Sequence, residues 1–361
     1  MGARHEVRLE ESLRSQAGQA RRPHRLWGRH CGYHLNGRLD RSGTHGGWRR
    51  HGTTVRSLRR VFGSAGDSII RRPTVDSRSQ VSAKIVVHVG AHKTGTSLIQ
   101  KYMRDKPEQL TPFGVRAVSR SDTNTLIGWG QALIDTPALL ADRLELEIRE
   151  PEARYVIASH ENPLGRPHLA SGDHLYPEAA TRIAALAGIL RRHDARVIMY
   201  LRPQASFLES YYLQLVQQGQ SFTFDQWLDR VDFTRVSWRP VVEMLREALG
   251  PERVVIGDFE EIRSGQESFL AQFFSRVDSA ITVSPHYKAR RNLSISDKGL
   301  RIALAANPHL RAASEKKQMR DFLQKHFSNE KYPRPVLFSD GQRNELDALY
   351  GDEYRDLTSG L

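Results

Sequence analysis

Dense apolar runs alternate with amphipathic segments along the chain from residue 84 onwards. The apolar runs predict buried strands, which lie at residues 84–89, 154–161, 195–202 and 253–262. Apolar residues at helical spacing predict helices, which lie at residues 96–105, 124–149 (interrupted at Pro137), 178–193, 203–218 and 238–250. After residue 265 the pattern is mainly helical. Strands that alternate with helices are typical of a parallel sheet covered on both faces, so we predict an α/β fold with a helical C-terminal part.

A parallel sheet of this kind binds its ligands beyond the carboxyl ends of its strands. Polar segments lie where the predicted strands end, at residues 90–97, 159–161, 202–210 and 258–261. Because the carboxyl ends of parallel strands meet at one edge, we expect these segments to surround a single cleft.

Charge separates the first 80 residues from the rest of the chain. They include 17 Arg, no Lys and 6 Asp or Glu, a net charge of +11, whereas the other 281 residues carry +2. Because this segment has few apolar runs to offset the entropy of ordering, we expect disorder at 1–80 and one domain at 81–361. Four interpretations of the basic segment stay open: an arm for nucleic acid or an anionic surface, a transit segment, a featureless tail, or leader sequence translated from too early a start codon.

The composition excludes some classes of protein. Cys31 is the only cysteine, so no internal disulfide can form, and a reducing, cytoplasmic location fits. We expect no membrane span, because no apolar run approaches the roughly 18 residues of a spanning helix. No secretory signal is recognisable.

The segment 84–100, KIVVHVGAHKTGTSLIQ, has the pattern of a phosphate-binding loop between a strand and a helix. Three positions keep the Walker A pattern G-x-x-x-x-G-K-[ST], namely Gly90, Gly95 and Ser97. Thr96 replaces the lysine of that pattern, and Lys93 stands three residues earlier. Backbone N–H groups of such a loop and the helix N-terminus attract phosphate. Hydroxyls that can donate to phosphate oxygens belong to Thr94, Thr96 and Ser97. We therefore predict a P-loop NTPase-like sheet.

A second motif follows the third predicted strand. Arg202 ends this strand, and Ser210 lies eight residues later on the next helix. An arginine fork together with a serine hydroxyl suits a terminal phosphate dianion. Taken alone, Arg202 could instead cap the sheet, and Ser210 could lie on a helix surface.

Taken together, HVGAHKTGTSLIQ and YLRPQASFLESYYLQLV resemble the 5′-phosphosulfate loop and the 3′-phosphate motif of the PAPS-dependent sulfotransferases. The bacterial branch related to carbohydrate sulfotransferases is the most similar. The resemblance covers roughly residues 83–361 and includes VIASHE, GPERVVIGDFEEI and RRNLSIS. One departure is Pro203, where many members carry a polar residue, but the spacing from Arg202 to Ser210 is kept.

The resemblance implies an enzyme that moves a sulfuryl group from 3′-phosphoadenosine 5′-phosphosulfate (PAPS) to a hydroxyl or amine acceptor, a small molecule or a carbohydrate. It implies no metal and no nucleic-acid partner. Lys93 would neutralise the phosphosulfate and stabilise the leaving oxygen, while Arg202 and Ser210 would hold the 3′-phosphate. Arg291 or Arg290 would add a phosphate contact. The remaining loop positions assigned to the co-substrate are Gly90, His92, Thr94, Gly95, Thr96 and Ser97.

Sulfuryl transfer to a hydroxyl also needs a general base. The second strand ends in SHENP, which offers His160 and Glu161. We favour Glu161, because carbohydrate-type relatives use a carboxylate; it could instead cap the following turn or pair with an arginine. His92 is a further candidate, although its position suits substrate contact better. His88 lies within a strand, and we expect it to be buried with its hydrogen bonds satisfied.

Two other functions stay open. A P-loop kinase with a degenerate Walker A motif would hold Mg²⁺ with Ser97 and a strand-end aspartate, for which Asp258 is the nearest candidate. A nucleic-acid-binding protein would act through its arginine-rich arm. The identity of the acceptor and the oligomeric state cannot be derived from the sequence.

Overall fold

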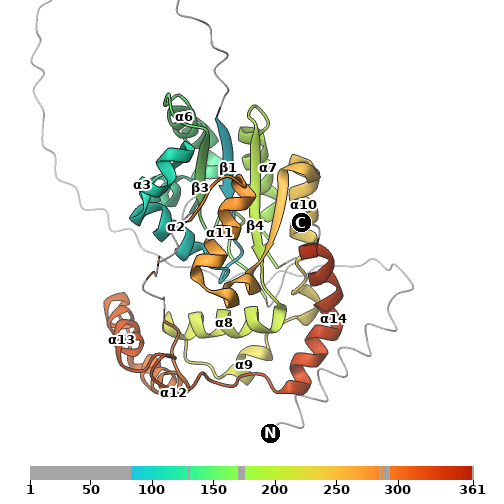
Figure 1. The fold of residues 1–361 in the computed structure, drawn as a ribbon. Coiled ribbons are helices and arrows are strands. Elements are labelled where there is room, and N and C mark those ends of the chain that lie inside the picture. Colours follow the sequence, from blue (N-terminus) through green and yellow to red (C-terminus); the bar gives the residue numbers. More distant parts are fainter. Residues whose placement is uncertain are drawn as a thin grey trace, which may run out of the picture. The chain divides into compact units, whose positions relative to one another are not determined.

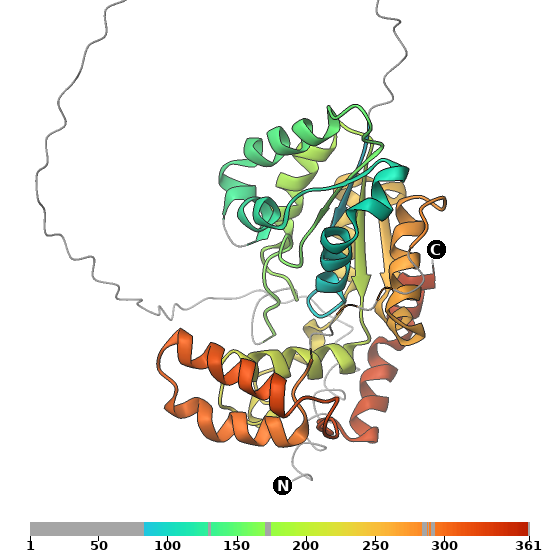
Figure 2. The ribbon, with the colours of Figure 1, turned by 60° about the vertical axis from the view of Figure 1, so that its left-hand side comes forward.

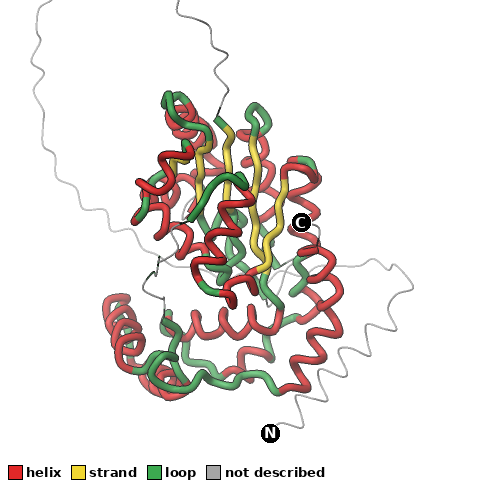
Figure 3. The backbone as a smooth tube through the Cα atoms, in the orientation of Figure 1, coloured by secondary structure: helices red, strands yellow, loops and turns green. Residues whose placement is uncertain are grey.

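The computed structural model describes residues 83–128, 131–169, 175–283, 287, 289 and 293–359. All of them belong to one unit, Gln80–Leu361, whereas the predicted basic segment lies outside the described residues. A five-stranded parallel sheet, with strand order β2–β3–β1–β4–β5, forms its centre (Figures 1 and 3). The strands are β1 (Lys84–His88), β2 (Val115–Ala117), β3 (Tyr155–Ser159), β4 (Ala195–Leu201) and β5 (Val254–Asp258).

Strand β1 occupies the middle of the sheet and decides where the site forms. Its last residue, His88, pairs in register with Ser159 of β3 on one side and with Ile198 of β4 on the other. The chain leaves β1 toward the β2 edge and later returns to add β4 on the opposite side. The loop after β1 therefore lies at the point where the strand order reverses, which is where parallel sheets bind ligands.

Helices cover both faces of the sheet, because successive strand residues point to opposite sides. Val87 belongs to one hydrophobic core and Val86 to the other. The Val87 face packs against α6 (Pro137–Ile148), α7 (Ala179–Leu190) and α10 (Arg239–Leu249). The Val86 face packs against α2 (Thr96–Asp105) and α11 (Gln266–Val277), which lie in front of the sheet in Figure 1.

A group of helices lies beyond the carboxyl ends of the strands (Figure 2). It consists of α8 (Gln204–Gln217), α9 (Phe224–Leu228), α12 (Asp297–Ala306), α13 (Ala313–His326) and α14 (Asp340–Ser359). Helix α8 packs against α12, α13 and α14, so it anchors the C-terminal helices to the end of β4. None of the helices among the described residues is long and apolar enough to span a membrane.

The predicted α/β fold with a helical C-terminal part is confirmed, but the sequence missed some elements. Strand β2 was missed because it has three residues, two of them exposed, and so shows no apolar run. The short helices α3 (Pro107–Leu110) and α9 were missed for the same reason of length. The helix predicted at 124–149 is divided into shorter pieces: the α-helices α5 (Ala132–Asp135) and α6 follow a π-helical segment, Asn124–Gly128, which itself continues α4 (Arg120–Thr123).

Candidate active site

The loop between β1 and α2 has a backbone shaped for a ligand. Lys93 has a φ of 66°, and among the described residues it is the one non-glycine residue with a positive φ. Such a conformation costs free energy and is concentrated at functional sites. Gly95 follows with a φ of 85° and begins α2, whose N-terminus has no side-chain cap. The first N–H groups of α2 therefore stay available to an anion.

The three hydroxyls predicted to face phosphate lie in different environments. The Thr94 hydroxyl donates to the Ala91 carbonyl oxygen at 2.6 Å, so it holds the turn of the loop. Ser97 is exposed on the first turn of α2. The Thr96 hydroxyl is buried and has no hydrogen-bond partner.

Lys93 and Arg202 lie close together although 109 positions separate them in the sequence. Nη1 of Arg202 donates to the carbonyl oxygen of Lys93 at 3.0 Å. Burial lowers the pKa of the Lys93 ammonium, the positive charge of Arg202 lowers it further, and the Glu161 carboxylate raises it. The charges of Arg202 and of the predicted base therefore both act on Lys93 at the carboxyl end of the sheet.

Arg202 is held in place by groups from three elements. Its Nε donates to Ser206 Oγ at 2.9 Å, and its guanidinium lies 4.9 Å from the centre of the Phe259 ring. Trp238 Nε1 donates to its carbonyl oxygen at 2.9 Å. Burial lowers the pKa of Arg202 to about 10. Ser210, the partner predicted from the sequence, lies half-buried one turn beyond Ser206 on α8.

Both ring nitrogens of His160 are engaged. Its Nδ1 accepts a hydrogen bond from the Asn162 backbone N–H at 3.0 Å, so Nε2 carries the proton and donates to Asn124 Oδ1 at 2.7 Å. Burial and, to a smaller extent, the charge of Arg120 lower the pKa of His160 to about 4. Glu161, by contrast, is half-buried, and its charge acts on Lys93.

His92 is buried and bound to Tyr176. The Tyr176 hydroxyl lies 3.2 Å from Nδ1 of His92 and also accepts its backbone N–H at 3.1 Å. Burial lowers the pKa of His92 to about 4, while a hydrogen bond with Asn162 raises it. These contacts hold His92 as part of the loop's support.

His88 differs from its sequence-based prediction. It is buried as expected, and its Nδ1 lies 2.9 Å from Ser159 Oγ. Its Nε2, however, is buried without a hydrogen-bond partner. The expectation that its hydrogen bonds are satisfied is wrong, because none of the described residues bonds to Nε2, which lies close to Gly90 of the phosphate-binding loop.

Other predicted residues fall outside the cluster. Arg290 and Arg291 lie outside the described residues. Asp258 is engaged by the Tyr354 hydroxyl and by the Glu260 backbone N–H, the latter at 2.7 Å. Within the described ranges, no group of three His, Cys, Asp or Glu side chains is arranged to hold a metal ion.

Several residues of the site were missed by the sequence analysis. They support the predicted residues and are His88, Asn124, Asn162, Tyr176, Ser206 and Phe259. Only Ser206 left a signal, because it follows Arg202 by four positions at the start of a helix. His88 and Asn162 are sequence neighbours of Gly90 and Glu161. Asn124, Tyr176 and Phe259 reach the site from segments that are distant in the sequence.

No protein-family model matches the chain, and no curated protein matches its sequence. Among solved structures, the chain is similar to a sulfotransferase from Alicyclobacillus acidocaldarius. The two share 17% sequence identity with a TM-score of 0.36, over 70% of this chain and 96% of the other. A similarity of this degree carries no argument about function, so the proposal below depends on the site alone.

Proposed function

We propose that this protein is a sulfotransferase that moves a sulfuryl group from PAPS to a hydroxyl or amine acceptor. The observation that carries the proposal is the pair formed by Lys93 and Arg202. Lys93 stands inside the loop in a left-handed conformation, and its carbonyl is bound to the Arg202 guanidinium. A lysine in this position suits a single phosphate with a group to transfer, whereas a triphosphate calls for the lysine at the helix start.

The residues present fit the two phosphates of PAPS. The uncapped N-terminus of α2 and the unpartnered Thr96 hydroxyl offer donors to the 5′-phosphosulfate. Arg202 and Ser210 of α8 offer donors to the 3′-phosphate. Ser206 holds the Arg202 guanidinium, since its own hydroxyl donates to the Pro203 carbonyl oxygen. Arg202 stacks on the Phe259 ring, and this contact helps to hold its guanidinium in place.

The residues of this site can account for every bond and proton that changes in the transfer. The acceptor oxygen attacks sulfur, the bond between sulfur and the bridging phosphate oxygen breaks, and its electron pair stays on the phosphate. The acceptor proton passes to the Glu161 carboxylate. Lys93 stabilises the negative charge that grows on the leaving oxygen. The products are a sulfate ester, or a sulfamate from an amine, and 3′,5′-ADP.

Glu161 is preferred to His160 as the base. The only lone pair of His160 is already used by the Asn162 N–H, and its lowered pKa disfavours proton uptake. Glu161 lies close enough to Lys93 for their charges to interact, which is where a base opposite the leaving group must stand.

Calorimetry of the full chain with 3′,5′-ADP, 5′-AMP and ATP–Mg²⁺ tests the proposal. We expect 3′,5′-ADP to bind and 5′-AMP to bind at least tenfold more weakly, since an ionic hydrogen-bonded phosphate contributes about 1.5–3 kcal/mol. Preference for ATP–Mg²⁺ would overturn the proposal in favour of a kinase.

A further inference from the structure

We propose that His88 is a positioning residue, which orients the Thr96 hydroxyl toward the bound phosphate through the hydrogen-bond chain Ser159–His88–Thr96. The inference deepens the proposed function and rests on it for the identity of the nucleotide. It gives a role to a buried imidazole that no step of the transfer itself uses.

The His88 ring is held rigidly in one place. It is fully buried, and its Nδ1 lies 2.9 Å from Ser159 Oγ on the neighbouring strand β3. Phe273 and Tyr200 meet it in edge-on contacts, with ring centres 5.3 and 6.0 Å away. These three contacts leave one polar atom of the ring, Nε2, without a partner.

Thr96 Oγ1 is the second buried polar atom without a hydrogen-bond partner. It lies close to the same glycine, Gly90, as His88 Nε2 does. Thr96 is 4% exposed and begins α2 at the end of the loop. A Cβ atom built on Gly90 would lie 2.4 Å from Thr96 Oγ1 and 3.2 Å from His88 Nε2. Because Gly90 has no side chain, the gap between the two atoms stays open, and Nε2–H of His88 can donate across it directly to Thr96 Oγ1.

Proton positions follow from the chemistry of the two groups. Burial lowers the pKa of His88 to about 3, so the imidazole is neutral and has one donor and one acceptor nitrogen. A phosphate oxygen accepts hydrogen bonds only, so Thr96 must give its proton to the phosphate. Its oxygen can then accept a proton only from Nε2–H of His88, and Nδ1 must accept from the Ser159 hydroxyl. In the opposite tautomer, the Thr96 oxygen would turn its lone pairs toward the anion.

The hydrogen-bond chain Ser159–His88–Thr96 connects the two halves of the site. Ser159 also accepts a hydrogen bond through its carbonyl oxygen, from Gln100 Nε2 of α2 at 2.7 Å. The next residues after Ser159 are His160 and Glu161. His88 therefore lies between the phosphate-binding loop and the strand end that carries the proposed base, and it sets their relative position.

Nitrogen NMR of the histidine rings tests the tautomer directly. In the complex with 3′,5′-ADP we expect His88 in the Nε2–H form. An Nδ1–H form in that complex would overturn the inference and leave the proposed function intact. If 3′,5′-ADP does not bind but ATP–Mg²⁺ does, the proposed function fails, and the same measurement with ATP–Mg²⁺ still decides the tautomer, since Thr96 faces a phosphate in both cases.

A matched pair of variants tests the consequence for binding. His88→Gln keeps an N–H near the position of Nε2, whereas His88→Asn keeps a polar group only near Nδ1. We expect His88→Asn to weaken 3′,5′-ADP binding about tenfold and His88→Gln to stay within about threefold of the wild type. Equal losses in both variants would point to packing alone and would overturn the inference.

Thr96→Val closes the test, because it removes the hydroxyl and keeps the shape of the side chain. If His88 acts through Thr96, His88→Asn should cost nothing more once Thr96→Val is present, so the double variant should bind as the Thr96→Val variant does. Additive losses in the double variant would mean that His88 acts by another route and would contradict the inference.

Discussion

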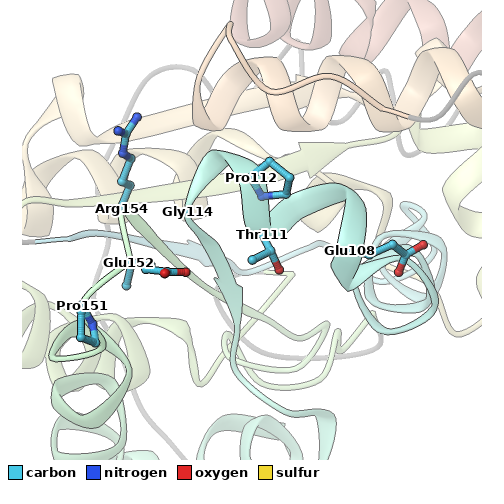
Figure 4. A pocket seen from close by; sticks show the side chains of 8 residues that line it. Glu108, Thr111, Pro112, Gly114, Pro151, Glu152 and Arg154 are labelled. Carbon is cyan, nitrogen blue, oxygen red and sulfur yellow. The ribbon is translucent and has the colours of Figure 1, made fainter.

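The amino and carboxyl ends of the sheet differ, and the difference shows that the size of a cavity does not indicate the chemistry of its lining. At the amino end a cavity of about 850 Å³ opens before β2 and β3 (Figure 4). Its lining consists of Glu108, Thr111, Pro112, Gly114, Pro151, Glu152, Ala153 and Arg154. The charged side chains of this lining are exposed, and in Figure 4 their charged ends do not converge on one point.

The carboxyl end has the opposite character. There Arg202 donates to the Lys93 carbonyl oxygen, and burial lowers the pKa values of both residues. His88 Nε2 and Thr96 Oγ1 are buried there without a hydrogen-bond partner among the described residues. Exposed charges stay hydrated whether or not a ligand binds, so they indicate little. Half-buried cations and buried polar atoms without partners cost free energy until an anion arrives, so they mark the site that is built for one.

The largest effect is expected from Lys93→Ala. It removes the cation that stabilises the leaving oxygen, and turnover should fall on the order of a hundredfold or more. Initial rates of PAPS-dependent transfer to an accepted acceptor measure this loss. Full activity in Lys93→Ala would remove the main support for sulfuryl transfer.

Arg202→Ala should weaken the binding of the nucleotide. We expect the affinity for 3′,5′-ADP to fall by about 1.5–3 kcal/mol, the range for hydrogen bonds to a charged group. Ser206→Ala should give a smaller loss, near 1 kcal/mol, because Ser206 only holds the Arg202 guanidinium in place and the guanidinium itself is kept. Calorimetry of both variants shows the order, and unchanged binding in Arg202→Ala would move the 3′-phosphate site elsewhere.

Acid should destabilise the carboxyl end through its histidines. Burial lowers the pKa of His88 to about 3 and those of His92 and His160 to about 4. The unfolded chain, with histidine pKa values near 6.5, then binds more protons than the folded protein between about pH 4 and pH 6.5. Stability should therefore decrease as pH falls through this window. Between about pH 7.5 and pH 6.5 we expect a loss of about 1 kcal/mol from the three groups together.

Urea unfolding at the two pH values measures the loss. His88→Asn should remove about one third of the pH dependence, because one of three buried neutral histidines is gone. A variant that kept the whole dependence would show that His88 takes up its proton as readily in the folded protein as in the unfolded chain.

The smallest effect is expected at the amino end. Arg154→Ala changes an exposed residue of the large cavity, so affinity for 3′,5′-ADP and stability should both stay within about 0.5 kcal/mol of the wild type. It is the matched control for Arg202→Ala, since both remove one arginine. A tenfold loss of nucleotide affinity in Arg154→Ala would reverse the comparison between the two ends.

The elements with strong local patterns were predictable. The apolar run before Gly90 and the helical spacing after Gly95 placed β1 and α2 close to their observed bounds. The strand ends that carry Glu161 and Arg202 followed from the same reasoning. Strand β2 was not predictable, because a three-residue edge strand is stabilised by its pairing with β3 and hardly by its own residues.

The sequence by itself determined the alternation of strands and helices, the phosphate-binding loop and the list of polar groups at the strand ends. Only the tertiary structure decided which of those groups meet. It gave Arg202 a bond to Ser206 and to the Lys93 carbonyl, engaged both nitrogens of His160, and left Nε2 of His88 without a partner. The physical reason is the distance in sequence over which each property is decided. The periodicity of apolar residues depends on neighbours in the chain that share one face of a helix or strand. Hydrogen-bond partners and pKa values depend on burial by segments that are distant in the sequence.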